Sequence, residues 1–184
     1  HAQFRRQRQM CIRDSSWLIN SGTNYLISGA PQHRMGNQHP NIVPYQVFST
    51  KDGHLIVAAG NDAQFARLCD VLGCPKLAKH SDYQSNQMRL KNRDRLIPIL
   101  ANEVTKWERN ALVTALDECH VPSGAIHDIE DVFATDQVAA REMKINMAHP
   151  AAGSKGVELI GNPVKFSKTK VSYRRPPPMC GEHN

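Results

Sequence analysis

Four consecutive residues of this 184-residue chain, Gly36, Asn37, Gln38 and His39, could take part in chemistry, and Pro40 follows them. Amide and imidazole groups can donate hydrogen bonds to a substrate, and a glycine lets the backbone approach it closely. The longer stretch GNQHPNIVPYQVFSTKDGHLIVAAGND continues into a predicted β-hairpin and helix. The stretch is therefore a catalytic loop, a structural turn, or the fingerprint of a larger protein that the chain only partly contains.

The common self-contained catalytic motifs are missing from the sequence. It has no G-x-G-x-x-G, G-x-x-x-x-G-K-[ST] or G-x-S-x-G pattern, so a phosphate loop and a serine nucleophile are unsupported. The adjacent carboxylates Glu130 and Asp131 fall at a helix start, where they complement the helix dipole. Cys74 follows a helix end, where nothing in the sequence indicates a reactive thiol. We therefore assign no catalytic residue within this chain.

Metal-binding residue types are present but scattered. Five cysteines are an odd number and form no C-x-x-C pair, which argues against a disulfide framework or zinc ribbon and favours free thiols. None of the nine histidines pairs with another ligand at the i, i+4 spacing on a clear helix. We predict no metal site and no permanently bound cofactor.

The net charge of +6 raises the question of nucleic-acid binding. Four arginines against one aspartate give residues 1–16 half of this charge, and only 6% of the chain is aromatic. A single-strand binder needs stacking aromatics among its basic residues, so we predict no nucleic-acid partner. No apolar run is long enough to span a bilayer, and we predict no membrane association. The expected compartment is the cytoplasm, or an organellar matrix if a targeting segment has been lost.

Residues 1–16, HAQFRRQRQMCIRDSS, differ from the rest of the chain. They show no sustained period of 2 or 3.6 residues, and they begin with His rather than Met. They resemble a translated non-native sequence joined to a reading frame. We expect this segment to be non-native or disordered, with the native sequence beginning near Ser16 or Trp17.

Two elements are predicted on either side of the Gly36–Pro40 segment. Residues 17–27 have the pattern of a helix end that Gly29 closes, because glycine readily adopts a positive φ. Residues 43–59 alternate as a two-stranded hairpin does, and Asp52-Gly53 supplies its turn. The hairpin has a structural role.

The next predicted helix covers residues 62–72. Asn61 or Asp62 would cap its first turn, and Gly73 would end it. Four apolar residues have the spacing of one buried helix face: Phe65, Leu68, Cys69 and Leu72.

Two longer helices are predicted after it. The first covers residues 85–104, and we expect a kink or split at Pro98 because proline removes a backbone hydrogen bond. Thr105 and Glu108 have the spacing of a capping box for the second, over residues 106–119. We expect five residues on its inner face: Trp107, Ala111, Ala115, Leu116 and Cys119.

The remaining chain is predicted to mix strands and short helices. Asp128 and Asp136 would begin two short helices after a short strand, and residues 143–171 alternate enough for two or three strands. The fold class is therefore mixed α/β. Strands do not alternate regularly with crossover helices, so we expect no complete Rossmann-like sheet.

Four segments, in this order, resemble the formyl-CoA transferase-like family III CoA-transferases, also called the CaiB/BaiF group. APQHRMGNQHPNIVPYQVFSTKDGHLIVAAGNDAQFARLCDVLG resembles the signature region of the family. RLKNRDRL resembles its R-x-x-N-R segment. VPSGAIHDIEDVFATDQVAAREM and IGNPVKFSKTKVSYRRPPPMCGEHN resemble the segments that follow. The resemblance covers nearly all of residues 17–184.

The resemblance implies an acyl-CoA:carboxylate CoA-transferase. Its substrates would be a coenzyme A thioester and a carboxylic acid, and an enzyme aspartate would carry CoA in a covalent intermediate. It also implies an intertwined homodimer. In the family the nucleophilic aspartate lies upstream of the position of Trp17, and Asp14 matches neither its neighbours nor its distance from the GNQHP loop. An acyl-CoA racemase of the same superfamily and a non-catalytic binding module are the alternatives.

We accordingly expect a C-terminal fragment, shortened at both ends and inactive alone. Residues 17–35 would be the end of a helix and a linker from the large domain. Residues 36–142 would form the small α/β domain, a hairpin with helices, and residues 143–184 the strands and proline-rich tail that return to the large domain.

The family resemblance also gives the Gly36–Pro40 segment a possible role. In relatives the matching loop folds over the active site. Asn37, Gln38 and His39 could then donate hydrogen bonds to an acyl carboxylate or an anhydride oxygen. The alternative is a structural turn fixed by Pro40 and Pro44.

Overall fold

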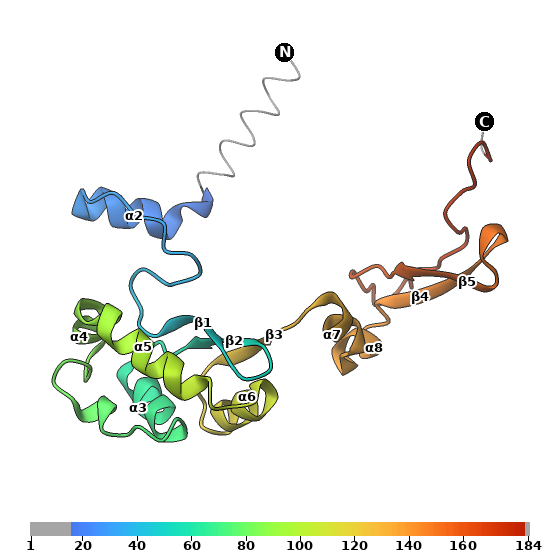
Figure 1. Cartoon of the computed structure of the whole chain (residues 1–184). Helices are drawn as coiled ribbons and strands as arrows, with labels where there is room; N and C mark the ends of the chain where they lie inside the picture. The colour runs from blue at the N-terminus through green and yellow to red at the C-terminus, as the bar shows by residue number, and fades with distance from the viewer. Residues whose placement is uncertain (1–15, 183–184) are drawn as a thin grey trace, which may run out of the picture. The chain divides into compact units, whose positions relative to one another are not determined.

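The computed structural model describes residues 16–182 of the chain (Figure 1). The prediction made for residues 1–16 therefore lies, apart from Ser16, outside the described residues. The chain forms two compact units that divide between Ile126 and His127, and each is described by itself. The domain limits expected from the family resemblance concern a longer protein and remain a prediction.

The first unit is built on a three-stranded antiparallel sheet in the order β1-β2-β3. Its strands are β1 (Tyr45–Ser49), β2 (His54–Ala58) and β3 (Ser123–Ile126). The predicted hairpin is confirmed as β1 and β2, which a four-residue turn joins, and the Thr50 N–H donates to the Gly53 carbonyl at 2.9 Å. Alternate residues of the hairpin are buried on one face, which helices cover: Gln46, Phe48, Leu55 and Val57.

Helix α2 (Ile19–Ser28) precedes the sheet and ends as predicted. Gly29 has a φ of 69°, and its N–H donates to the Tyr25 carbonyl at 2.7 Å. No residue of α2 is buried. Three apolar side chains on or next to the helix are almost fully exposed: Trp17 at 87%, Leu26 at 82% and Ile27 at 82%.

Helix α3 (Asp62–Val71) confirms the prediction made from its local signals. The Asn61 side chain accepts a hydrogen bond from the Gln64 N–H at 2.9 Å, and Gly73 has the expected positive φ of 73°. The predicted apolar stripe is buried in full. A 3₁₀ turn over Leu77–Lys79 follows α3.

The predicted helix over residues 85–104 is two helices, α4 (Asn86–Lys91) and α5 (Arg93–Val104). Of the kink or split predicted at Pro98, the split was wrong, because Pro98 lies inside α5 and the two helices separate at Asn92. The kink stays a prediction. The Asn92 side-chain amide donates to the Met88 carbonyl at 3.0 Å and to the Asp82 carbonyl at 3.1 Å. The asparagine thus satisfies the last turn of α4 while its backbone leaves the helical conformation.

Helix α6 (Arg109–Glu118) begins three residues later than predicted, and the capping box was wrong. The Thr105 hydroxyl instead donates to the Asn102 carbonyl at the end of α5. The Glu108 side chain makes no capping hydrogen bond. The Arg109 N–H donates to Asp52 Oδ1 at 2.7 Å, so the cap of α6 comes from the turn of the hairpin.

The predicted inner face of α6 is only partly correct. Leu116 is buried as expected, but Leu112, one residue after the predicted Ala111, is the other fully buried side chain. Ala111 is exposed and Ala115 is half-buried. Trp107 and Cys119 pack against the core from the ends of the helix.

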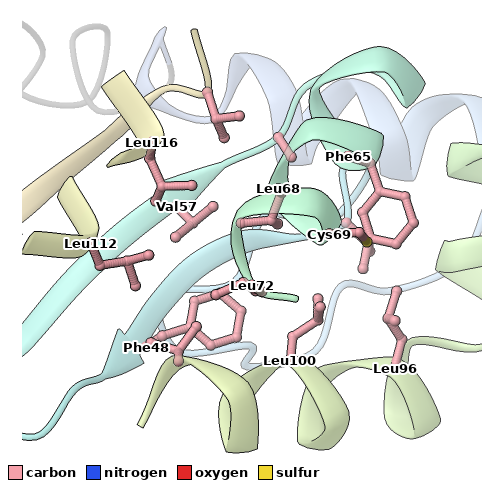
Figure 2. Close-up of a cluster of buried hydrophobic side chains, with 14 of the residues drawn as sticks. Phe48, Val57, Phe65, Leu68, Cys69, Leu72, Leu96, Leu100, Leu112 and Leu116 are labelled. Atoms are coloured by element: carbon pink, nitrogen blue, oxygen red, sulfur yellow. The ribbon is translucent and has the colours of Figure 1, made fainter. Parts of the chain in front are cut away.

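One hydrophobic core joins the sheet to helices α3, α5 and α6, which gather on one of its faces (Figure 1). Figure 2 shows the side chains of this core pointing toward one another from the sheet and the helices. The labelled members that come from the sheet, α5 and α6 are Phe48, Val57, Leu96, Leu100, Leu112 and Leu116. The described residues thus form a mixed α/β fold with small antiparallel sheets and no complete Rossmann-like sheet.

A charged side chain, Arg89 of α4, is fully buried beside this core. Its Nε donates to the Val43 carbonyl at 2.7 Å, Nη1 to the Tyr83 carbonyl at 3.0 Å, and Nη2 to Asp62 Oδ1 at 2.8 Å. The guanidinium also lies 4.4 Å from the centre of the Phe65 ring. One cation therefore joins the segment before β1, the start of α3, and the turn before α4.

The second unit contains two short helices and one hairpin. Helix α7 (Ile129–Ala134) is capped by the Asp128 carboxylate as predicted, and α8 (Asp136–Ala140) by the Thr135 hydroxyl. Strands β4 (Lys144–His149) and β5 (Gly153–Ile160) pair antiparallel, with a 3₁₀ turn at Pro150–Ala152 between them. Between residues 16 and 182, none of the helices is both long and apolar enough to cross a membrane.

The hydrogen bonds of Arg89 give a first prediction. The substitution Arg89→Met should lower the free energy of unfolding by about 3–5 kcal/mol, because two buried carbonyls lose their donors. Urea denaturation of the full chain measures this loss. The control Arg95→Met removes an exposed arginine that pairs with Asp82 at 3.1 Å, and it should cost less than about 1 kcal/mol. Equal losses in the two variants would contradict the role given to Arg89.

The contact between Asp52 and α6 gives a prediction about pH. The hydrogen bond from the Arg109 N–H holds the pKa of Asp52 below its usual value, with help from the Thr50 hydroxyl and in spite of partial desolvation. A lowered folded-state pKa stabilises the protein at neutral pH, and this contribution disappears as the pH falls below about 4. The stability of Asp52→Asn should therefore fall less steeply with acidification than that of the wild type, while the exposed control Asp117→Asn keeps the wild-type slope. Chemical denaturation from pH 6 to pH 3 would measure both, and parallel curves for the wild type and Asp52→Asn would contradict this assignment.

Candidate functional site

The candidate site is the segment Gly36–Pro40, here called the 36–40 loop, between α2 and β1. Gly36 has a φ of 61°, in the left-handed region that glycine adopts without strain. The Gln38 N–H donates to the Met35 carbonyl at 3.2 Å, and the His39 N–H donates to the Tyr45 carbonyl at 2.9 Å. The loop is therefore a tight turn anchored to the start of β1.

The three polar side chains predicted for the site each bond to a neighbouring group. Asn37 Oδ1 accepts from the Val47 N–H at 3.1 Å, and His39 Nδ1 accepts from the Asn41 N–H at 3.1 Å. The His39 ring also stacks on the Tyr45 ring, with the ring centres 5.1 Å apart and the planes within 9°. The structure thus brings these side chains together in one turn and fixes how they are oriented.

Arg93, the first residue of α5, holds the loop from the helical side. Its Nη1 donates to Gln38 Oε1 at 3.2 Å, and its Nη2 donates to the His39 carbonyl at 2.7 Å and to the Pro40 carbonyl at 3.2 Å. Desolvation lowers the pKa of Arg93, although the neighbouring Asp94 opposes the shift. An arginine stays cationic in such surroundings, so a positive charge lies directly against the loop.

The contact between Arg93 and the loop was not predicted from the sequence, although Arg93 belongs to the R-x-x-N-R segment. Each polar residue of that segment makes different contacts. Arg89 is buried beside the core, Asn92 ends α4, and Arg93 binds the loop. The segment could have identified Arg93 as a candidate, but nothing in it indicates the loop as its partner.

Asparagines hold the chain on the other side of the loop. Asn41 and Asn24 of α2 bond side chain to side chain, at 3.1 Å and 3.4 Å. Asn86 of α4 donates from its side chain to the Asn41 carbonyl at 2.8 Å and accepts from the Val43 N–H at 3.1 Å. An open groove of about 510 Å³ lies beside this contact, lined in part by Ile27, Met35 and Pro40.

The electrostatics around the loop favour a negatively charged ligand. No aspartate or glutamate occurs between Asp14 and Asp52, whereas Arg34 and Lys51 lie in the same interval. Arg93 adds a cation from α5, in direct contact with the loop. Anions bind where donors and positive charge converge, and Arg93 supplies such a charge, although the neighbouring Asp94 offsets part of it.

Two cysteines also interact in the first unit. Cys69 is buried in the core, and Cys74 is partly exposed just after Gly73. A hydrogen bond between their thiols lowers the pKa of Cys74, although partial burial opposes the shift. The sequence showed no cause for such a shift, because the partner of Cys74 is Cys69, five positions earlier on the buried face of α3.

Two further features of the described residues bear on binding. A groove of about 1040 Å³ in the second unit is lined by the cations Lys165, Lys170 and Arg174, and its Lys144 is already paired with Glu158 at 2.8 Å. Over residues 16–182, no group of three histidine, cysteine, aspartate or glutamate side chains is placed to hold a metal ion.

Comparison with known proteins identifies the class to which this fold and loop belong. The sequence profile of CoA-transferase family III matches residues 10–184. The match includes part of residues 1–16, the segment expected to be non-native or disordered. The chain therefore belongs to CoA-transferase family III, as the resemblance implied. A CAIB/BAIF family protein from Brucella suis has the same fold, with a TM-score of 0.78 and 40% identity over 92% of this chain.

Two curated relatives carry specific names. The chain is 41% identical over 169 residues to a succinate–glutarate CoA-transferase of Agrobacterium fabrum, and 39% identical over 166 residues to the human succinyl-CoA:glutarate CoA-transferase. These matches cover 92% and 90% of this chain, but 42% and 37% of the relatives. The Brucella suis match covers 43% of that chain. The chain thus spans about two fifths of the length of these relatives.

The contacts of Arg93 predict how the loop is held. In Arg93→Met the three hydrogen bonds to the loop are lost, so the loop should open more often while the core stays intact. Hydrogen exchange of the His39 amide should accelerate by about tenfold or more, because a charged hydrogen bond contributes about 1.5–3 kcal/mol. The exposed substitution Lys91→Met on α4 is the control and should leave this exchange unchanged. An unchanged His39 amide in Arg93→Met would show that the loop is held by other contacts.

Proposed function

We propose that this chain forms part of an acyl-CoA:carboxylate CoA-transferase, an enzyme that moves coenzyme A from an acyl-CoA donor to a carboxylic acid. One observation carries the proposal, namely 41% identity to a named CoA-transferase over 92% of the chain. Membership of CoA-transferase family III and the Brucella suis structure support it.

The proposed substrates are short dicarboxylic acids and their CoA thioesters. The two named relatives, at 41% and 39% identity, act by their names on succinate or succinyl-CoA and on glutarate. Both acids carry two negative charges at neutral pH. The run without acidic residues from Ser15 to Lys51, with Arg93 against its loop, supports a substrate of this charge.

The proposed reaction proceeds through a carboxylate of the enzyme. An aspartate oxygen attacks the thioester carbon and displaces the CoA thiolate, which gives a mixed anhydride. The thiolate then attacks the enzyme's carbonyl carbon, releases the donor acid and leaves an aspartyl-CoA thioester. The acceptor acid attacks this thioester, and the same two steps run in reverse to give the new acyl-CoA. We assign none of these covalent steps to a residue of this chain, and the 36–40 loop serves the site by binding.

The exposed apolar residues on and next to α2 support a further part of the proposal, a homodimer of the whole enzyme. Trp17, Leu26 and Ile27 are each more than four-fifths exposed, and an apolar patch of this kind is a typical contact surface. We propose that the rest of the enzyme or its second subunit covers them.

A chimeric enzyme tests the proposed function. Residues 17–184 would replace the matching segment of the Agrobacterium fabrum relative, and the purified protein would be mixed with succinyl-CoA and glutarate. We expect glutaryl-CoA to form at about 1 per second or faster, the ordinary range for enzymes. Mass spectrometry measures the product.

Two further samples make this result decisive. The 184-residue chain alone should produce no glutaryl-CoA, because it carries no assigned nucleophile. A chimera that melts cooperatively at the temperature of its parent and yet forms no glutaryl-CoA would refute the proposed function.

A further inference from the structure

The end of helix α3 is a Schellman motif, a turn in which the chain beyond the helix folds back on its last turn. The Cys74 N–H donates to the Cys69 carbonyl at 2.8 Å, and the Gly73 N–H donates to the Asp70 carbonyl at 3.1 Å. Gly73 supplies the positive φ, 73°, that the motif requires. The backbone at the end of α3 therefore brings residue 74 back beside residue 69.

Both residues that the motif brings together are cysteines. These two positions frequently make an apolar contact in Schellman motifs, and here the two thiols form a hydrogen bond. A disulfide needs Cα atoms about 4.4–6.8 Å apart and side chains directed toward each other. The backbone hydrogen bond between Cys69 and Cys74 meets the first need, and the hydrogen bond between their thiols meets the second.

The two thiols differ in exposure and in acidity. Cys69 is fully buried, and Cys74 is half-buried against the same core. The hydrogen bond with Cys69 lowers the pKa of Cys74, although partial burial opposes the shift. The same bond raises the pKa of Cys69, and burial adds to the rise. Cys74 is therefore the thiol that ionises first and that a reagent can reach, while Cys69 stays protonated in contact with it.

We propose that Cys69 and Cys74 form a dithiol that a low-molecular-weight disulfide oxidises reversibly to a disulfide bond at the end of α3. An accessible thiol that ionises readily, next to a second thiol that can displace whatever it has bound, is the arrangement on which thiol–disulfide exchange depends. The site involves neither the substrates nor the 36–40 loop of the proposed function, so it is tested without them.

The exchange takes two steps in which atoms and electrons balance. The Cys74 thiolate attacks one sulfur of the reagent disulfide, and the first reagent thiolate leaves and takes a proton from water. The Cys69 sulfur then attacks Cys74 Sγ and loses its proton, and the second reagent thiol leaves with that proton. The cysteine pair loses two electrons, and the reagent disulfide gains them. An excess of the reagent thiol reverses both steps.

Mass spectrometry of the full chain tests the proposal, with glutathione disulfide as the probe. After exposure to the probe, the remaining thiols are alkylated and the chain is cut with trypsin, which cleaves after Arg67 and Lys76. Both cysteines then lie in one peptide, residues 68–76. We expect this peptide to be unalkylated and two hydrogen atoms lighter than its reduced form. The exposed Cys180 should carry glutathione in the same digest, which shows that the probe has reacted.

Two variants separate the steps of the exchange. Cys69→Ala removes the thiol that closes the bond, so glutathione should stay on Cys74, where it does not accumulate in the wild type. Cys74→Ala leaves only the buried thiol at the site, and Cys69 should then take up no glutathione.

A comparison with the chain unfolded in urea needs no substitution. The ratio of closed peptide to peptide that carries glutathione should be about tenfold higher or more in the native chain, because the fold holds the two sulfurs in contact.

Three results would overturn the proposal. In the first, the peptide of residues 68–76 keeps both thiols while Cys180 carries glutathione. In the second, glutathione stays on Cys74 in the wild type. In the third, the ratio is equal in the native and unfolded chains, because the fold would then contribute nothing to closure. None of these results depends on CoA-transferase activity, so they leave the proposed function unaffected.

Discussion

The buried guanidinium of Arg89 is the contact on which the first unit depends. A cation removed from water is strongly destabilising unless hydrogen-bond acceptors surround it, and here two carbonyls, one carboxylate and an aromatic ring do so. These acceptors come from segments on either side of the β1–β2 hairpin, so α4 has one favourable position against the start of β1. That position in turn places Arg93, four residues later, against the 36–40 loop. The geometry of the candidate site therefore follows from a contact in the interior.

The hydrogen-bonding groups of the 36–40 loop connect this interior contact to the proposed function. Every side-chain acceptor in the loop is bonded to a donor of the protein, and the outward groups are donors backed by a cation. Asn37 is exposed and Gln38 and His39 are half-buried, so water can satisfy these donors and an anion can replace that water. The dicarboxylates named for the relatives of this chain are anions of this kind.

The sequence predicted what depends on local signals. Helix α3 was correct from its Asn61 cap to its Gly73 end, because the cap, the apolar stripe and the terminating glycine all lie within thirteen residues. Two contacts were missed because a distant residue supplies the partner. Asp52 caps α6 from 57 positions away, and Arg93 reaches Gln38 across 55 positions. Neither contact leaves a trace in periodicity or spacing, so the loop residues could be named from sequence while their orientation could not.

A crystal structure of the active chimera with glutarate bound tests most directly whether the 36–40 loop is a carboxylate site. We expect a glutarate oxygen within about 3 Å of Asn37 Nδ2 and Gln38 Nε2, with the two amide oxygens still bonded to Val47 and Arg93. Glutarate bound elsewhere, with the loop donors bonded to carbonyls of the surrounding protein, would contradict this role and leave the loop as a structural turn.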